Sequence, residues 1–290
     1  MSRYTLESLQ NHAKGYRLLA LDLDGTLLTS EKKISPRTLR VLKQAIDKGF
    51  AIVLTTGRHP RSALLYSEQL SPITEKSYAV CFNGSAVISL QKFKEKPADA
   101  GFSCLSANLA GGDMIADLAS YVHSMGCKVH GYSRERGLVI EDMNPQSKRE
   151  VCHSGCGYQQ IDFSSCTSAE GFFKLIAVGQ SQKIDALRTS LPQRFLDYFS
   201  VLRTDPDFLE FIPERSTKGT ALASLCDLIG IGLDRTVAFG DAENDLEMIK
   251  LAGLGVAMGN AQQQQLKDEA DVVTLSNDED GVAAVVERLM

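Results

Sequence analysis

The stretch Leu18-Leu19-Ala20-Leu21-Asp22-Leu23-Asp24-Gly25-Thr26 runs from apolar residues into two aspartates. Its composition predicts a strand buried on both faces, with Asp22 and Asp24 at or just beyond the carboxyl end. Side chains alternate along a strand, so both carboxylates are expected on the same side. Crowded carboxylates repel unless a cation or a shared proton compensates them, and Mg²⁺ favours oxygen ligands. The alternative is a strand-to-turn corner in which both aspartates make only turn and cap hydrogen bonds.

Length and composition restrict the class of protein. A chain of 290 residues can form one large or two ordinary domains. Its apolar share (43%) and charged share (23%) are those of a soluble globular protein. The net charge of −5 and the scattered lysines and arginines argue against a nucleic-acid partner. The polar segment 1–16 lacks a signal-type apolar core, and no stretch is long enough to cross a bilayer, so we expect a cytoplasmic protein without a membrane partner. The oligomeric state is not predicted.

Strands and helices alternate at both ends of the chain. Ser35-Pro36 is a helix start and Gly49 a helix end, followed by strands at 50–55 and 78–82. The C-terminal third repeats this order, with a helix ending at Gly230 and strands at 236–239, 254–258 and 271–274. Strand–helix–strand units of this length imply parallel crossovers, hence an α/β fold with an open parallel sheet and helices on both faces.

The middle of the chain has a different pattern. Asn83-Gly84 between two apolar runs predicts a tight turn, and residues 128–132 with 138–140 predict antiparallel neighbours. An inserted α+β module over residues 85–207 fits this contrast, and it leaves residues 1–84 and 208–290 as the parallel-sheet domain. The segment also contains Cys152-His153-Ser154-Gly155-Cys156 and Cys166. A zinc site is one interpretation, but the spacing is loose and reduced thiols are the alternative.

Three further loops follow strands or open helices. In open α/β sheets the ligand lies beyond the carboxyl ends of the strands. Thr56-Gly57-Arg58 after the second strand offers a hydroxyl, backbone N–H groups and a cation, although a generic turn also uses Thr and Gly. Gly240-Asp241-Ala242-Glu243-Asn244-Asp245 contains more acidic and amide side chains than helix capping requires. Lys218 opens a helix, where a cation is unfavourable unless an anion lies nearby or water solvates it.

Together these loops suit phosphoryl transfer, in which carboxylates hold Mg²⁺ while lysine and N–H groups neutralise the phosphoryl oxygens. A carboxylate can also act as the nucleophile and form an aspartyl-phosphate. A kinase-like enzyme is a weaker interpretation, because the chain lacks a glycine-rich nucleotide loop.

The chain resembles the haloacid dehalogenase-like phosphatase superfamily, in its Cof-type (subclass IIB) branch. The resemblance covers both flanking segments nearly end to end and implies a Rossmann-like core with an inserted cap domain for substrate specificity. Residues 255–261 and 277–282 also resemble that branch, whereas the cap resembles it only in position, length and its Asn83-Gly84 entrance. The motifs occur in the family's order: Asp22-Leu23-Asp24-Gly25-Thr26, Thr56-Gly57-Arg58, Lys218-Gly219 and Gly240-Asp241 with Asn244-Asp245.

The resemblance implies a role for each matching position. Asp22 would attack phosphorus, Asp24 would protonate the leaving alcohol and then activate water, and Thr56 and Lys218 would bind the phosphoryl group. The implied metal set is Asp22, the main-chain carbonyl of Asp24, Asp241 and Asp245, with Asn244 and Asp245 orienting that shell or the substrate. The implied substrate contacts are Gly57, Arg58, Asn83, Gly84 and Asn244.

We therefore expect a Mg²⁺-dependent phosphatase of small phosphorylated metabolites, sugar phosphates first and flavin or pyridoxal phosphates next. A phosphomutase using the same aspartyl-phosphate is one alternative. A non-catalytic metabolite-binding regulatory protein is another, although such a protein could lose Asp22, Asp24 or Lys218 and all three are present. The cap sequence does not identify the substrate.

Overall fold

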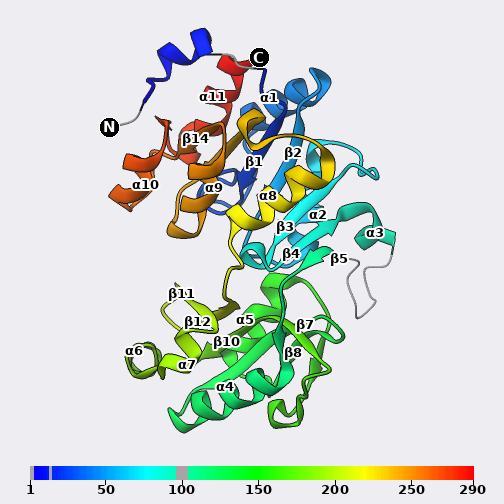
Figure 1. Cartoon of the computed structure of the whole chain (residues 1–290), viewed down its shortest axis with the longest axis vertical. Coiled ribbons are helices and arrows are strands. Elements are labelled where there is room, and N and C mark those ends of the chain that lie inside the picture. Colours follow the sequence, from blue (N-terminus) through cyan, green and yellow to red (C-terminus); the bar gives the residue numbers. More distant parts are fainter. Residues whose placement is uncertain (1–2, 13–14, 96–103) are drawn as a thin grey trace. The chain divides into compact units, whose positions relative to one another are not determined.

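A computed structural model describes residues 3–12, 15–95 and 104–290. The chain divides into two compact units (Figure 1), one formed by residues 1–92 with 217–290 and the other by residues 93–216. Both limits of the second unit lie several residues later than the limits of 85 and 207 predicted above. Strand β12 (Phe208–Pro213) belongs to the second unit, because it pairs with two strands of that unit.

The first unit is built on a largely parallel sheet. Its strand order is β15-β14-β13-β1-β2-β3-β4, parallel throughout except for the antiparallel β3–β4 pair. The strands are β1 (Leu18–Asp22), β2 (Ala51–Thr55), β3 (Tyr78–Cys81), β4 (Ala86–Ser89), β13 (Thr236–Gly240), β14 (Leu254–Ala257) and β15 (Val272–Val273). The helices are α1 (Pro36–Asp47), α2 (Pro60–Leu70), α3 (Leu90–Glu95), α8 (Lys218–Ile229), α9 (Leu246–Leu251), α10 (Gln264–Glu269) and α11 (Gly281–Leu289), of which α3 crosses the division between the units.

Helices cover both faces of this sheet, as the sequence predicted. Strand β1 shows the reason, because its alternate side chains enter two different apolar clusters. Leu19 and Leu21 pack in the cluster that contains α1 and α11, and Leu18 and Ala20 pack in the cluster that contains α8. All five residues of β1 are therefore buried, and the strand carries its polar chemistry only at its carboxyl end.

Local signals set the helix ends. The Ser35 side chain accepts the Thr38 N–H and Pro36 opens α1, as predicted, and Gly49 follows this helix with a φ of +90°. Gly230 ends α8 in the left-handed conformation. The Asn83-Gly84 turn between β3 and β4 is also as predicted, and both turn residues have positive φ.

The second unit has a mostly antiparallel sheet in the order β11-β12-β10-β7-β8-β9, with β6 beside β10. The predicted antiparallel pairing of residues 128–132 with 138–140 is confirmed by β7 and β8. Helices α4 and α6 supply Ile115, Leu118, Ile184 and Leu187 to its apolar core. The elements are β5 (Cys104–Ala107), β6 (Ala110–Gly111), α4 (Gly112–Ser124), β7 (Lys128–Ser133), β8 (Gly137–Ile140), α5 (Pro145–Ser154), β9 (Tyr158–Gln160), β10 (Gly171–Val178), α6 (Ser181–Ser190), α7 (Gln193–Leu196), β11 (Phe199–Asp205) and β12.

The cysteines considered for zinc do not form a metal site among the described side chains. Cys152 is exposed, Cys156 is half-buried, Cys166 is buried, and all three are free thiols. Burial raises the pKa of the Cys166 thiol to about 11, which disfavours the thiolate that zinc requires. The only group of three candidate ligands in the described part of the chain is acidic and lies elsewhere. The side chain of His153 lies outside the described residues.

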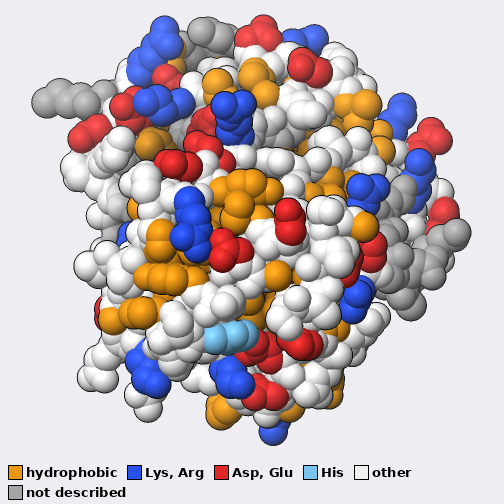
Figure 2. All heavy atoms as spheres, turned by 60° about the horizontal axis from the view of Figure 1, so that its bottom comes forward, with side chains coloured by type: hydrophobic (Ala, Val, Ile, Leu, Met, Phe, Trp, Pro, Cys, Tyr) orange, Lys and Arg blue, Asp and Glu red, His pale blue; other side chains and the backbone are white. Residues whose placement is uncertain are grey.

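The surface and helices add two observations. Basic, acidic and hydrophobic side chains are interspersed over the face shown in Figure 2, without a broad region of one charge. No helix within the described residues is both long and apolar enough to cross a membrane.

Candidate active site

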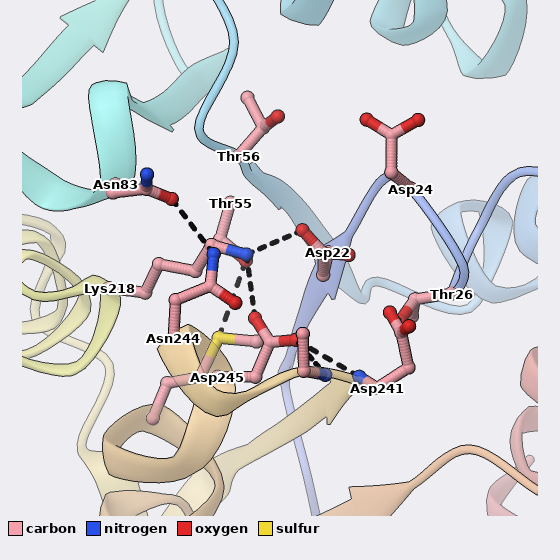
Figure 3. Close-up of polar contacts among 12 residues, drawn as sticks. Asp22, Asp24, Thr26, Thr55, Thr56, Asn83, Lys218, Asp241, Asn244 and Asp245 are labelled. Carbon is pink, nitrogen blue, oxygen red and sulfur yellow. Dashed lines mark hydrogen bonds and ion pairs between the residues drawn. The ribbon is translucent and has the colours of Figure 1, made fainter. Parts of the chain in front are cut away.

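The site lies at the carboxyl ends of parallel strands in the first unit (Figure 3). Asp22 is the last residue of β1, and Asp241 directly follows β13, the strand beside β1. Asp245 closes the short helix η5 (Glu243–Asp245) behind Asp241. Oxygens of these three carboxylates lie within 4.8 Å of one another. The fold thus joins aspartates more than two hundred positions apart in sequence.

Lys218 is the buried cation of this group. Its Nζ lies 2.5 Å from Oδ1 of Asp22 and 2.6 Å from Oδ1 of Asp245. The lysine side chain is only 1% exposed, so its charge depends on these carboxylates rather than on water. Burial alone would lower the pKa of Lys218, but the two aspartates outweigh it and raise that pKa. The anion expected near a lysine at a helix start is therefore present. The alternative interpretation, that water solvates Lys218, is wrong.

The close approach of two loops places Lys218. Gly84, at the turn before β4, has a φ of +101° and lies directly against the backbone of Thr217, where a Cβ would come within 2.1 Å of the Thr217 carbonyl oxygen. Thr217 caps α8 by accepting the Thr220 N–H at 3.0 Å. The first helical residue, Lys218, therefore starts from a fixed point beside the turn.

Asp245 and Asp241 use their oxygens differently. One oxygen of Asp245 binds Lys218, and the other accepts the N–H groups of Asp241 and Ala242 at 3.0 and 3.1 Å. Asp241 accepts a hydrogen bond on Oδ1 from the hydroxyl of Thr26 at 2.9 Å. Asp245 is thus occupied on both oxygens within the protein, which suits an orienting role.

Charge at the site is unbalanced. Lys218 is the one cation that forms ion pairs with Asp22, Asp241 or Asp245 among the described residues. Burial, partly opposed by Lys218, raises the pKa of Asp22 well above its usual value. Burial and the neighbouring Asp245 raise the pKa of Asp241 to about 6. Three carboxylates facing one lysine therefore fit a divalent cation with oxygen ligands.

Asp24 points away from this acidic group (Figure 3) and is held by two cations. Arg58 donates to both of its oxygens at 2.6 and 2.5 Å, and Lys32 donates to Oδ1 at 2.7 Å. Burial would raise the pKa of Asp24, but these two partners outweigh it and lower that pKa. Arg58, predicted as a substrate contact, is thus a partner of Asp24 in this structure.

The remaining predicted residues line the neighbouring loops. The Asn244 amide donates to Oδ1 of Asn83 at 2.9 Å, and Gly57 leaves room for Asn83, since a Cβ there would lie 2.8 Å from the same oxygen. Thr56 is buried, and its hydroxyl accepts the Arg58 N–H at 3.1 Å. The structure therefore brings Asn83, Asn244 and Gly57 together, and the N–H of Asn83 also donates to the carbonyl of Thr56 at 3.0 Å.

Two residues that donate to aspartates of the site, Thr26 and Lys32, were not predicted as site residues. Thr26 belongs to the first motif, and its position directly after Gly25 could have indicated that its hydroxyl contacts an aspartate of the site. Lys32 lies in the polar run Ser30-Glu31-Lys32-Lys33, which is typical of a solvated turn. Its φ of +60° and the hydrogen bond from the Tyr66 hydroxyl to its carbonyl appear only in the structure.

Comparison with known proteins identifies the family. Residues 19–286 match the model of the haloacid dehalogenase-like hydrolases, and the chain belongs to that family. It is 32% identical over 254 residues to an HMP-PP phosphatase of Serratia proteamaculans, covering 86% of each chain. It is 29% identical over 272 residues to a 5-amino-6-(5-phospho-D-ribitylamino)uracil phosphatase of Bacillus subtilis, covering 92% of this chain and 94% of that one.

A solved structure agrees with this result. A haloacid dehalogenase-like hydrolase of Bacteroides thetaiotaomicron is 30% identical, with a TM-score of 0.81 over 95% of this chain and 100% of that chain. The predicted family and α/β fold class are confirmed, and the chain is a phosphatase-type hydrolase. Phosphatases of this family generally use a divalent metal, and the acidic group of Asp22, Asp241 and Asp245 is present for one.

Proposed function

We propose that the protein is a Mg²⁺-dependent phosphatase of small phosphorylated metabolites that forms an aspartyl-phosphate on Asp22. The observation that carries this proposal is the charge imbalance at the ends of β1 and β13, where one buried lysine faces three carboxylates. Asp22 and Asp241 and the main-chain carbonyl of Asp24 would hold Mg²⁺. When bound, the ion would supply positive charge to the phosphoryl oxygens.

The chain's own residues divide the reaction between them. The Asp22 carboxylate attacks phosphorus and the bond to the leaving oxygen breaks, while Asp24 donates a proton to that oxygen. Asp24 then takes a proton from the water that attacks the aspartyl-phosphate, which releases phosphate and restores Asp22. Lys218, already 2.5 Å from Asp22, favours the ionised form of this carboxylate against the effect of burial and offers positive charge to the phosphoryl group. Arg58 and Lys32 lower the pKa of Asp24, so Asp24 must leave these two cations in order to carry a proton to the leaving oxygen.

The names of the relatives support the substrate class. One acts on HMP-PP and another on a phosphoribitylamino-uracil, and each covers more than four fifths of this chain. We propose small phosphorylated metabolites on this basis. The order of sugar phosphates first and phosphorylated cofactors next rests on the resemblance of the motifs alone. Residues 93–216 would act as the substrate-specificity domain, because the motif residues account only for the phosphoryl group.

Turnover of p-nitrophenyl phosphate tests the proposal. We expect Mg²⁺-dependent release of phosphate by the unaltered protein, and Asp22→Asn should lower kcat at least about 10³-fold because it removes the nucleophile. Asp47→Asn is the matched control, since Asp47 is an exposed residue at the end of α1. Activity that survives Asp22→Asn unchanged would refute the proposed nucleophile.

A further inference from the structure

Two loops near the C-terminus hold the loop that carries Asp24, and neither belongs to the four motifs. One loop follows β14 and contains Asn260, and the other follows β15 and contains Asn277. The Asn260 amide donates from Nδ2 to the carbonyl of Gly25 at 2.8 Å. The Asn277 amide donates from Nδ2 to the carbonyl of Leu28 at 2.8 Å. Two side-chain amides thus bind two carbonyls of one loop.

The orientation of the Asn260 amide follows from its second contact. The backbone N–H of Asn277 donates to Oδ1 of Asn260 at 3.0 Å. A backbone N–H can only donate, so the atom facing it is the amide oxygen, and the NH₂ group must face Gly25. Asn260 therefore joins Gly25 to the second loop with both ends of its side chain satisfied.

Gly25 is the point at which this contact reaches the acidic group. Its φ is +82°, and a Cβ at this position would lie 2.3 Å from Oδ2 of Asp241. The next residue, Thr26, donates its hydroxyl to Oδ1 of Asp241 at 2.9 Å. The carbonyl that Asn260 binds belongs to the Gly25–Thr26 peptide, so a rotation of this peptide would change the contacts of Asp241 with Gly25 and Thr26.

The loop of Asn260 is itself fixed to the other side of the acidic group. The N–H of Met258 donates to the carbonyl of Gly240, the residue before Asp241, at 3.0 Å. The N–H of Gly259 donates to Leu275 at 3.0 Å, and a Cβ on Gly259 would lie 2.9 Å from the Ser276 nitrogen. Asn260 thus stands between the loop that begins at β1 and the loop that begins at β13.

We propose that Asn260 is a positioning residue for the cation site: its amide fixes the Gly25–Thr26 peptide and thereby the placement of Asp241, which lies against both residues. This inference rests on the proposed divalent cation, but it does not require that the protein be a phosphatase. Asn277 acts on the same loop three residues further along, so its effect on the acidic group is smaller.

Isosteric variants test this assignment. Asn260→Asp keeps an acceptor for the Asn277 N–H but places an oxygen against the Gly25 carbonyl. The added negative charge of this variant would by itself strengthen cation binding. Weaker binding of Mg²⁺ would therefore result from the loss of the N–H donor to the Gly25 carbonyl. Asn277→Asp is the matched control, because it adds the same charge while Asn260 still donates to Gly25.

The readout is the rise in unfolding temperature across a Mg²⁺ titration, with kcat and KM for p-nitrophenyl phosphate measured beside it. We expect Asn260→Asp to raise the apparent Kd for Mg²⁺ about 10-fold, and Asn277→Asp less than about 3-fold. Both variants should melt within a few degrees of each other without Mg²⁺. If Asn260→Asp does not fold, Asn260→Ser takes its place with the same expectation.

Three results would overturn the inference: equal weakening by both variants, an unchanged Kd for Mg²⁺ in Asn260→Asp, or no response of the unaltered protein to Mg²⁺. A protein that responds to Mg²⁺ as expected but releases no phosphate would instead contradict the proposed function and support the positioning role. The two failures are therefore distinguishable.

Discussion

Each unit of the molecule contains a buried lysine that contacts one or more carboxylates. The two arrangements differ in the balance between positive and negative charges. In the first unit Lys218 faces Asp22 and Asp245, with Asp241 close by. In the second unit Lys174 and Glu210 form an ion pair at 2.9 Å, on adjacent antiparallel strands β10 and β12. The balanced pair lies within strands, whereas the unbalanced group lies where strands end.

This difference separates a structural pair from a candidate site. Lys174 and Glu210 are 5% and 9% exposed and neutralise each other, and Lys174 also lies 5.5 Å from the ring centre of Tyr132. No further ion is needed there. In the first unit the excess of carboxylates stays uncompensated, and the pKa of Asp22 and Asp241 is raised as a result of burial and crowding. Buried charge alone therefore does not mark function, but buried charge without balance does.

The largest contrast should come from removing each lysine in turn. We expect Lys218→Met to lower kcat for p-nitrophenyl phosphate by about 10²- to 10³-fold, because the phosphoryl group loses a fixed positive charge. Lys174→Met should leave kcat within about 3-fold, since its amino group is engaged by Glu210. Steady-state kinetics on both variants checks this prediction. Similar losses of kcat in both would remove the distinction between the two lysines.

The carboxylates offer a second contrast, in the dependence on metal. Asp241→Asn should raise the Mg²⁺ concentration for half-maximal activity about 100-fold, because it removes a charged ligand from the group. Glu210→Gln should leave that concentration unchanged. Titration of activity with Mg²⁺ measures both. A normal Mg²⁺ dependence in Asp241→Asn would show that this carboxylate does not hold the ion.

Variants of the Lys174–Glu210 pair, which should leave activity nearly unchanged, should lower the stability of the fold. Lys174→Met leaves the Glu210 carboxylate buried without the cation that pairs with it, and we expect it to lower the free energy of unfolding by about 3–5 kcal/mol. Adding Glu210→Leu should restore most of this loss, because an apolar pair of similar volume needs no charge balance. Urea unfolding monitored by circular dichroism compares the two variants. A double variant as unstable as the single one would contradict a closed structural pair.

The last contrast concerns His130, which is fully buried beside Phe208 in the second unit. Burial lowers the pKa of His130 to about 4, with Lys174 and Arg149 adding to this effect and Glu150 opposing it. The unfolded chain therefore binds more protons between pH 6.5 and 4, and stability falls as pH decreases through this window. The loss should reach about 3 kcal/mol.

His130→Phe isolates this contribution from the other titrating groups. The difference in unfolding free energy between the unaltered protein and the variant should change between pH 7 and pH 4, in favour of the variant at low pH. Urea unfolding at a series of pH values provides the measurement. A difference that is independent of pH would mean that His130 does not titrate between the folded and unfolded states.

The sequence predicted the scaffold because its signals are local. Ser35-Pro36, Gly49 and Gly230 determine helix ends through their own backbone and side-chain preferences, and the apolar run of β1 reports its burial directly. The contacts of the site were harder to predict, because they join loops far apart in sequence. Three sets of contacts depend on strand register and side-chain rotamers. They are the bond of Lys218 to Asp245, the bonds of Arg58 and Lys32 to Asp24, and the bond of Asn260 to Gly25. No local pattern encodes these distances.

The most direct test of the central claim is to trap the phosphorylated protein. The chain would be mixed with a small phosphorylated substrate and Mg²⁺, quenched in acid during turnover, digested and analysed by mass spectrometry. We predict a phosphoryl group on the peptide that contains Asp22, and its absence in Asp22→Asn and when a chelator removes the metal. A phosphoryl group on another residue, or phosphorylation of Asp22 that persists without metal, would contradict the account.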